Sequence, residues 1–392
     1  MDLTKHYDVV IVGGGIVGSS TAYYLRKNGF KGTIAVVEKD TTYKHAATTL
    51  SWGGIRGQFS TPENILLSGF TLRLIRGLKQ EFGAEADISF REQGYLVLAS
   101  EASVSVLFGN AKLQNSMGVD TVLYDRKDLE NKFSYANFEG IALGSWGRSN
   151  EGWFDPYALL SLIRKGAIAK GVDYIADEVT AVEVGAQIES VTLKKIGKIG
   201  AGVVVNAAGA SGGAIAAMVN FDLPVSTAKR FVYVVDCPDA PEAFRKGPAW
   251  FNIDGVYWRP EGRNFLFGFT PSEDEEPKIK DWEMEHHWFE EKIWPSVYTR
   301  IPSCEALKVV SSYVGHYDYN WFDQNGIIGR HPSIENFYFG NGFSGHGIQQ
   351  GPATGNAIAE LICFGEYRAI DLTAMGVERI VAGRPLFEKN IF

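Results

Sequence analysis

The stretch VVIVGGGIVGSSTAYYLRKNGFKGTIAVVEKD, residues 9–40, decides the fold class of this 392-residue chain. It opens with a short apolar run, Val9–Val12, which is typical of a buried strand in a parallel sheet. A helical pattern follows and stops at Gly29, and a second apolar run, Thr33–Val37, leads to Glu38. The order strand, helix, strand predicts one βαβ unit.

Three glycines between the first strand and the helix fit the pattern G-x-G-x-x-G: Gly13, Gly15 and Gly18. The first permits a tight turn, the second lets a pyrophosphate approach the backbone, and the third lets the helix pack on the strand. The N–H groups at the helix N-terminus would then bind phosphate. Glu38, at the tip of the second strand, would accept hydrogen bonds from ribose hydroxyls. In this context a dinucleotide site is a stronger hypothesis than a glycine-rich turn without a ligand.

The rest of the chain alternates between two kinds of pattern. A polar, glycine-bearing loop at residues 41–64 is too long for a plain connector and is typical of a functional loop. The apolar spacing predicts an amphipathic helix over Leu66–Phe82, a strand over Glu92–Ser100, and a helix that begins near Pro156. A second apolar strand that ends in small residues is expected within Ala201–Gly213.

Between Leu223 and Lys308 aromatic residues increase, and the pieces RFVYVVD, GVYWRP and NFLFGF predict an antiparallel sheet. The sequence therefore predicts an α/β (overall α+β) fold with two interleaved domains. A Rossmann-like nucleotide-binding domain of the glutathione-reductase type is expected at residues 1–85, 150–220 and 320–392. A substrate domain built on the antiparallel sheet is expected at residues 86–149 and 221–319.

The stretch GNGFSGHGIQQGPATG, residues 340–355, repeats the logic of the N-terminus, because a strand leads into glycines and then into a helix that starts near Gly347. The positive end of that helix would stabilise an electron-rich group, such as the N1–C2=O edge of a reduced flavin. Gln349 or Gln350 could donate hydrogen bonds to that group. His346 has two open interpretations, a contact with the cofactor or a hydrogen bond to the backbone.

Composition excludes several classes of function. The net charge is −8, from 46 acidic and 38 basic side chains, and without a basic block we expect no nucleic-acid partner. The long uncharged run Ile199–Phe221 carries five glycines, so a buried strand, a turn and a helix start explain it better than a membrane span. His286 and Glu290 have helical spacing, but zinc needs three or four ligands, so we expect a solvated acidic helix and no metal.

The cysteines and the N-terminus indicate a compartment. Cys237, Cys304 and Cys363 are sparse and odd in number, which favours a reducing environment without disulfides or zinc. The first residues show neither a secretory nor a mitochondrial leader. These observations predict a cytoplasmic protein.

Several motifs together carry a resemblance that spans nearly the whole chain: VVIVGGGIVGSSTAYYL, GYLVLAS, GWFDPYALL, VVNAAGAS, VYWRPEG and GFSGHGIQQGPATGNAIAELI. They resemble the D-amino-acid-oxidase-type (DAO) family of FAD-dependent oxidoreductases, which includes sarcosine oxidases, glycine oxidases and dimethylglycine dehydrogenases. TLSWGGIRGQFSTPENI, YDYNWFDQNGIIGRHP and the paired glutamines are most similar to a branch of the family that assists the assembly of respiratory complex I.

The resemblance implies FAD as cofactor and the oxidation of a small secondary (N-methyl or N-alkyl) amino acid. Hydride would pass from the amine carbon to flavin N5, the imine would hydrolyse, and the electrons would reach a carrier or O2. The reacting amine must be neutral, so activity should rise with pH. Two alternatives stay open, an assembly or scaffold flavoprotein with structural FAD and a 2-hydroxy-acid dehydrogenase. The N-substituent, the electron acceptor and a homo-oligomeric state also stay open.

The resemblance also implies roles for individual residues. Arg56 aligns with an arginine that contacts the substrate carboxylate, and Arg259 of VYWRPEG would lie on the sheet that covers the flavin. With Tyr257, His346 and Gln349 they form the predicted catalytic set, and Tyr313 is a weaker candidate for lining the pocket. Surface ion pairs for the arginines and plain packing for the tyrosines are the alternatives. The predicted FAD contacts are Gly13, Gly14, Gly15, Ile16, Val17, Gly18, Glu38, Lys39, His45, Ala46, Thr48, Thr49, Leu50, Ser51, Gly53, Gly54, Val179, Ala207, Ala208, Gly209, Gly342, Phe343, Ser344, Gly345, His346, Gly347, Ile348 and Gln349.

The chain departs from monomeric sarcosine oxidase at three positions. Gln349 replaces a lysine after the GHG motif, Leu266 replaces the lysine that activates oxygen, and Ser311 aligns near the cysteine that binds flavin covalently. We therefore expect non-covalent FAD and a dehydrogenase rather than a fast oxidase. His45 resembles a histidine that bonds flavin covalently in dimethylglycine dehydrogenase, so a link there is an alternative.

Overall fold

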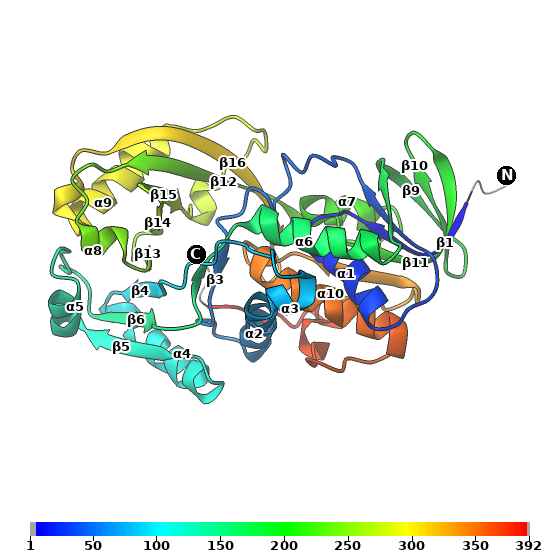
Figure 1. Cartoon of the computed structure of the whole chain (residues 1–392), viewed down its shortest axis with the longest axis horizontal. Helices are drawn as coiled ribbons and strands as arrows, with labels where there is room; N and C mark the ends of the chain where they lie inside the picture. Colours follow the sequence, from blue (N-terminus) through cyan, green and yellow to red (C-terminus); the bar gives the residue numbers. More distant parts are fainter. Residues whose placement is uncertain (1–4, 390–392) are drawn as a thin grey trace.

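The computed structural model describes residues 5–389, which form two eight-stranded sheets and a small two-stranded one (Figure 1). The first sheet has the order β17-β18-β11-β1-β2-β8, with β10 and β9 attached through β11. β1 pairs in parallel with β2 and β11, and β11 pairs in parallel with β18. Its strands are β1 (His6–Val12), β2 (Ile34–Glu38), β8 (Asp173–Ala176), β9 (Val179–Val184), β10 (Ile188–Leu193), β11 (Gly197–Asn206), β17 (Ile327–Arg330) and β18 (Phe337–Asn341).

Helices on one face of this sheet and a β-ribbon on the other explain the continuous apolar run of β1. Val9 and Ile11 pack into a core with α1, α2, α6 and α10, whereas Val10 and Val12 pack into a second core with β9, β10 and α7. Both faces of the strand are therefore buried, as parallel strands require. The helices are α1 (Ile16–Lys27), α2 (Pro62–Arg76), α6 (Pro156–Ala169), α7 (Gly212–Ala217) and α10 (Gly347–Phe364). The predicted Rossmann-like fold is confirmed.

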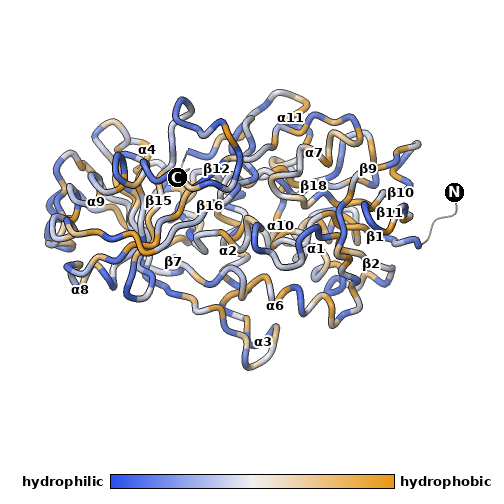
Figure 2. Tube along the Cα trace, turned by 90° about the horizontal axis from the view of Figure 1, so that it is seen from above, coloured by the Kyte–Doolittle hydropathy of each residue, from blue (hydrophilic) through white to orange (hydrophobic). Residues whose placement is uncertain are grey.

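The second sheet has the order β16-β12-β15-β14-β13-β4-β6-β5. β12, β14 and β15 pair antiparallel, as the aromatic pieces predicted. Its core holds the fully buried side chains Trp250, Trp258, Phe265 and Phe267. The strands are β4 (Tyr95–Ala99), β5 (Thr121–Asp125), β6 (Leu143–Gly147), β12 (Val225–Asp236), β13 (Ala249–Phe251), β14 (Val256–Glu261), β15 (Asn264–Phe269) and β16 (Lys308–Asn320). In Figure 2 much of the hydrophobic trace follows the strands, and several loops at the rim are hydrophilic.

The remaining elements are short or peripheral. β3 pairs antiparallel with β7, which joins the loop before α2 to the segment before α6. Their bounds, with those of the outer helices, are β3 (Gly54–Ile55), β7 (Gly152–Trp153), α3 (Leu78–Phe82), α4 (Val104–Ser116), α5 (Arg126–Lys132), α8 (Glu242–Arg245), α9 (Trp294–Arg300) and α11 (Glu378–Val381).

One predicted helix needs correction and another is largely confirmed. The single helix expected over Leu66–Phe82 starts earlier, at Pro62, and is divided at Gly77, whose N–H bonds back to Arg73 O and ends α2. The acidic helix expected around His286 and Glu290 does form from His287 onward, where a short helical step leads through the π-helical turn Phe289–Ile293 (η4) into α9, and His286 and Glu290 are exposed. A strand does form within Glu92–Ser100, and α6 does begin at Pro156, where the Asp155 side chain accepts a hydrogen bond from Ala158 N.

The chain passes between the two sheets several times, as interleaved domains would require. Residues 86–149 supply β4, β5 and β6 of the second sheet, after β1 and β2 have entered the first. The exact domain boundaries stay a prediction. Ile199–Phe221 forms most of β11, a turn and α7, as expected. Within residues 5–389, none of the helices combines the length and apolarity needed to cross a membrane.

Candidate active site

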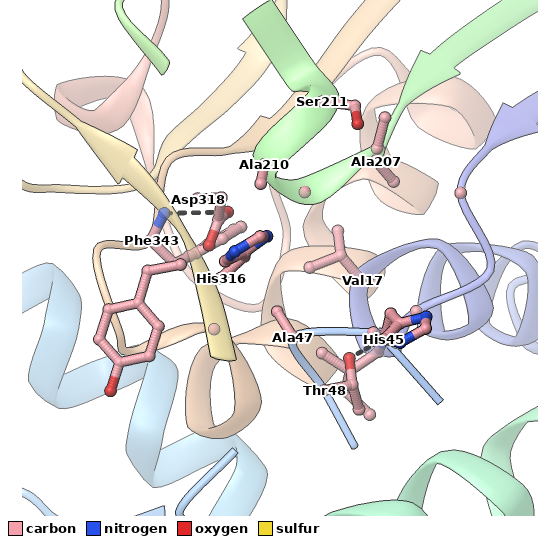
Figure 3. Close-up of a pocket in the computed structure, with 18 of the residues that line it drawn as sticks. Val17, His45, Ala47, Thr48, Ala207, Ala210, Ser211, His316, Asp318 and Phe343 are labelled. Carbon is pink, nitrogen blue, oxygen red and sulfur yellow. Dashed lines mark hydrogen bonds between the residues drawn. The ribbon is translucent and has the colours of Figure 1, made fainter. Parts of the chain in front are cut away.

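A cavity of about 260 Å³ lies at the carboxyl ends of β1, β2 and β11. The β1–α1 loop, the tip of β2, the loop around Thr48, and the end of β11 form its walls on the side of the first sheet. Thr227 of β12 and His316, Tyr317 and Asp318 of β16 come from the second sheet. Figure 3 shows His316, Val17, Ala47 and Thr48 around the same space. Ligands of open α/β sheets bind at this end of the strands.

The glycine loop after β1 is built as the motif predicts. Gly13 has φ +98°, its N–H donates to Val37 O at 2.9 Å, and a Cβ there would overlap Ala207 O. A Cβ on Gly18 would overlap Gly13 O, so only glycine lets α1 pack this closely on the loop. Gly15 precedes the first turn of α1, whose residues Ile16, Val17 and Gly18 are uncharged. The helix therefore presents its positive end to the cavity.

Glu38 and Thr48 organise the backbone around that helix end. Glu38 Oε2 accepts from Gly14 N and Oε1 accepts from Asp40 N, both at 2.8 Å. Thr48 Oγ1 accepts from Ile16 N at 3.0 Å. The half-buried Glu38 carboxylate lines the cavity with lone pairs left for hydroxyl donors. Thr49 Oγ1 is buried and has no hydrogen-bond partner in the described part of the chain.

The second helix end at the cavity is that of α10. The loop before it is held by Asp318, whose Oδ2 accepts from Gly342 N at 2.9 Å and from Phe343 N at 3.2 Å (Figure 3). Burial raises the pKa of the Asp318 carboxyl to about 6. Ser344 and Gly345 take φ +49° and +96°, which turn the chain so that Gly347 and Ile348 face the cavity.

These walls fit FAD. One helix end and Glu38 match a pyrophosphate and a ribose, and a second helix end matches another electron-rich group of the same molecule. Among the predicted FAD contacts, those that line the cavity are Gly13, Gly15, Ile16, Val17, Glu38, Lys39, His45, Ala46, Thr48, Ser51, Ala207, Ala208, Gly209, Phe343, Gly345, Gly347 and Ile348.

Other predicted FAD contacts do not line this cavity: Gly14, Gly18, Thr49, Leu50, Gly53, Gly54, Val179, Gly342, Ser344, His346 and Gln349. Several have structural reasons for their residue type. A Cβ on Gly53 would overlap Phe154 O, and one on Gly54 would overlap the Tyr95 hydroxyl. Val179 lies in β9, paired with Leu193 in the core on the far face of the sheet.

Arg56, His346 and Gln349 form a buried cluster at the start of α10. Arg56 Nη2 lies 3.3 Å from His346 Nε2, and its guanidinium carbon lies 4.0 Å from the Phe59 ring centre. Burial and the Arg56 charge hold the pKa of His346 well below its usual range, so the imidazole is neutral at pH 7. Since arginine only donates, Nε2 accepts and Nδ1 carries the proton. Gln349 Oε1 accepts from Arg56 N at 2.9 Å and from Ser68 Oγ at 3.2 Å.

Arg259 and Tyr257 lie in a different, aromatic cluster. Arg259 donates to Trp52 O at 2.9 Å through Nη2, and it also pairs with Glu261. The centre of the Tyr257 ring lies 5.3 Å from that of Trp52 and 5.4 Å from that of Phe251. Burial raises the pKa of the Tyr257 hydroxyl. The Arg259 side chain is buried, so its ion pair with Glu261 differs from the exposed surface ion pair that was the alternative for this residue. Neither residue lines the cavity of Figure 3.

Sequence reasoning missed several residues. Trp52 lies in the Arg259 cluster, and its Nε1 is buried with no hydrogen-bond partner among residues 5–389. The cavity also includes Thr227, Trp282, His316, Tyr317 and Asp318, which only strand register and a distant loop bring there. Of the positions that depart from sarcosine oxidase, Leu266 lies on β15 opposite Val234 and Arg259, and Ser311 lies on β16 opposite Val234. Tyr313 pairs with Val232.

Comparisons with known proteins agree with this geometry. The family model described as DAO, FAD dependent oxidoreductase, matches residues 8–361. The chain is 40% identical to FAD-dependent oxidoreductase domain-containing protein 1 of Xenopus laevis, over 98% of this chain and 84% of that protein. It is 27% identical to sarcosine oxidase subunit beta of Rhizobium meliloti, over 93% of this chain and 86% of that protein. The crystal structure of L-proline dehydrogenase from P. horikoshii is similar with a TM-score of 0.85 and 25% identity, over 98% of this chain and 100% of that chain.

Proposed function

Because the chain belongs to the DAO family of FAD-dependent oxidoreductases, we propose that it oxidises a small secondary amino acid at the carbon next to its amine. The observation that carries the proposal is the buried Arg56 guanidinium beside neutral His346 at the start of α10. A planar guanidinium matches a carboxylate. The likeness to sarcosine oxidase subunit beta and to L-proline dehydrogenase supports a secondary amine as the substrate.

The residues have separate roles in this proposal. FAD supplies the hydride acceptor when bound. Arg56 binds the substrate carboxylate, and His346 orients Arg56 by accepting its hydrogen bond. Gln349 fixes the Arg56 backbone, since its side-chain oxygen accepts from Arg56 N. Trp52 Nε1 offers a further donor, and the rings of Tyr95, Phe251 and Tyr257 exclude water from that side.

The proposal includes a preference for a carrier over oxygen as electron acceptor. Leu266, an apolar side chain on β15, aligns with the lysine that activates oxygen in monomeric sarcosine oxidase. We propose non-covalent FAD as well, with a bond to His45 as the alternative, since the exposed His45 ring lies at the cavity wall. Peroxide formed at the rate of flavin reduction in air would contradict the carrier preference.

The test is an anaerobic visible spectrum of the FAD-loaded protein before and after adding N-methyl and N-alkyl amino acids and 2-hydroxy acids. We expect an amine to bleach the flavin band near roughly 450 nm. In Arg56→Lys the charge stays but the planar fork is lost, so half-bleaching should need about tenfold more substrate. Arg76→Lys is the control, because Arg76 is an exposed residue of α2 that pairs with Glu92 at 2.6 Å.

Three other results of the bleaching experiment would contradict parts of the proposed function. Bleaching by a hydroxy acid alone would contradict an amine substrate. A yellow protein that no compound bleaches would contradict catalysis and would favour an assembly flavoprotein that keeps FAD for structure. An equal loss in Arg56→Lys and Arg76→Lys would remove Arg56 from the substrate site.

A further inference from the structure

An acidic segment between β15 and η4 lies across the second sheet beside the cofactor cavity. We call residues 276–285 the strap. Asp281 and Glu285 of the strap bind Lys229 Nζ of β12 at 2.6 and 3.3 Å. The Lys229 side chain is only 2% exposed. A buried ammonium left without its partners is costly, so these two carboxylates hold the strap against β12.

A second buried cation docks the other end of the strap. Arg230, the next residue of β12, pairs with Glu276 at 2.7 Å, and both side chains are mostly buried. Lys280 pairs with the same carboxylate at 2.8 Å. The strap is otherwise irregular, so charge pairs rather than a backbone ladder attach it to the sheet.

The strap carries one aromatic side chain to the cavity. The Trp282 ring stacks on the His316 ring, with 3.9 Å between the ring centres, and its centre lies 4.5 Å from that of the His45 ring. All three residues line the cavity. Trp282 is also 42% exposed, so one part of the indole meets the cavity and another meets solvent. His316 Nε2 lies 2.9 Å from Asp281 O, which ties the strap backbone to the same wall.

We propose that the strap is a lid over the FAD cavity and that Trp282 closes its mouth. Opening separates Trp282 from His45 and His316 and breaks the ion pairs to Lys229 and Arg230. FAD enters and leaves only while the strap is open. Strap opening therefore limits both the association and the release of FAD.

The experiment measures both rates with Trp282→Ala. Association is followed by the quenching of FAD fluorescence on mixing with apoprotein, and release by the fluorescence that returns on dilution of the FAD-loaded protein. We expect both rates to rise about tenfold, as two lost ring contacts allow. Trp294→Ala is the matched control, since Trp294 of α9 is 44% exposed and is not a cavity residue. Its rates should equal those of the unchanged protein.

A faster release with an unchanged association rate would overturn the lid, because Trp282 would then be a static contact. Unchanged rates in a folded Trp282→Ala would overturn it as well. Trp282→Phe keeps an aromatic ring and replaces the alanine variant in the rate measurements if the alanine variant does not fold.

A second test of the strap changes the salt concentration. Raising NaCl from about 0.05 to about 0.5 M should speed release in the unchanged protein more than in Lys229→Met, which keeps the Arg230–Glu276 ion pair between the strap and β12. Equal salt effects in the two proteins would contradict the ionic docking.

Discussion

Glu151 is a buried carboxylate next to the Arg56 cluster. Its Oε1 accepts from Gly57 N at 2.7 Å and from Gln58 N at 3.1 Å, and its Oε2 accepts from Gln58 Nε2 at 2.8 Å. These bonds and Arg56 favour the ionised form, but burial outweighs them and raises the pKa of Glu151 from 4.5 to about 7. The folded protein therefore holds a proton at mildly acidic pH that the unfolded chain releases.

This shift predicts a pH dependence of stability. Between pH 4.5 and about 7 the folded state binds more protons at Glu151 than the unfolded state, so the free energy of unfolding falls as pH rises. Glu151→Gln lacks this titration. The difference in free energy of unfolding, unchanged protein minus variant, should fall by on the order of 3 kcal/mol from about pH 5 to about pH 8. Urea unfolding at several pH values measures it, and a flat or rising difference would contradict the raised pKa.

For single residues, the sequence predicts a structural role where a local motif determines the geometry of the residue. Gly13, Gly18 and Glu38 were predictable because their geometry depends on neighbours within one βαβ unit. Trp52 was not, because its importance lies in an unpaired buried Nε1 that only the packed structure reveals. Arg56 was named from a resemblance, and its partner His346 lies 290 residues away in sequence.

The two helices whose N-termini reach the cavity, α1 and α10, pack directly on each other. A Cβ on Gly355 of α10 would overlap Ser20 and lie 2.5 Å from Thr21 N. A Cβ on Gly351 would lie 2.7 Å from Ile16. Small residues thus set the distance between the helices, and with it the distance between the two positive helix ends.

Gly355→Ala should therefore push α1 and α10 apart. We expect a loss of about 2 kcal/mol in the free energy of unfolding from overpacking, together with weaker FAD binding. Gly109→Ala in exposed α4 is the matched control, because no described atom lies within 4 Å of a Cβ there. It should add about 0.5 kcal/mol, as alanine does inside a helix. Equal effects of the two variants on unfolding would contradict the close packing.

Elements were predictable where the pattern is continuous and not where tertiary contacts override it. The βαβ unit, α6 and α10 follow from apolar spacing and from glycine or proline at their ends. The start of α2 was missed because Pro62 follows a polar loop with little apolar signal. The segment EMEHHWFEEK, residues 283–292, is helical from His287 onward, as its spacing indicates, whereas Glu285 before the helix binds Lys229.

Over the whole molecule, the cavity depends on both sheets. Residues of the β1–α1 loop form one wall, and Thr227 and His316 on the second sheet form the other. The antiparallel register of β12 and β16 sets the position of the second wall, with Thr227 opposite Asp318. Sequence patterns identify such strands but not their register, so this half of the cavity could not be predicted.

FAD bound between the sheets should stabilise the whole chain. At a free FAD concentration 100 times its Kd, binding raises the free energy of unfolding by about 2.7 kcal/mol. For a chain of this size, that increase raises Tm by about 3 °C. Calorimetry with and without FAD measures the shift. Gly13→Ala should abolish it, because its Cβ would overlap Ala207 O at a φ of +98°. Gly29→Ala should keep it, since Gly29 has φ +89° but no described atom within 4 Å of a Cβ. A shift retained by Gly13→Ala would contradict the assignment of the cavity.

The strand order of the first sheet also determines when each strand can pair during translation. β1 lies between β2 and β11, so one of its edges stays unpaired until residues 197–206 have left the ribosome. α1 lacks one of its packing partners until α10 ends at Phe364. At about 5–20 residues per second, this delay is on the order of tens of seconds. Nascent chains thus expose a sheet edge and an apolar helix face, which favours binding by chaperones, and FAD can be captured only after α10 has been translated.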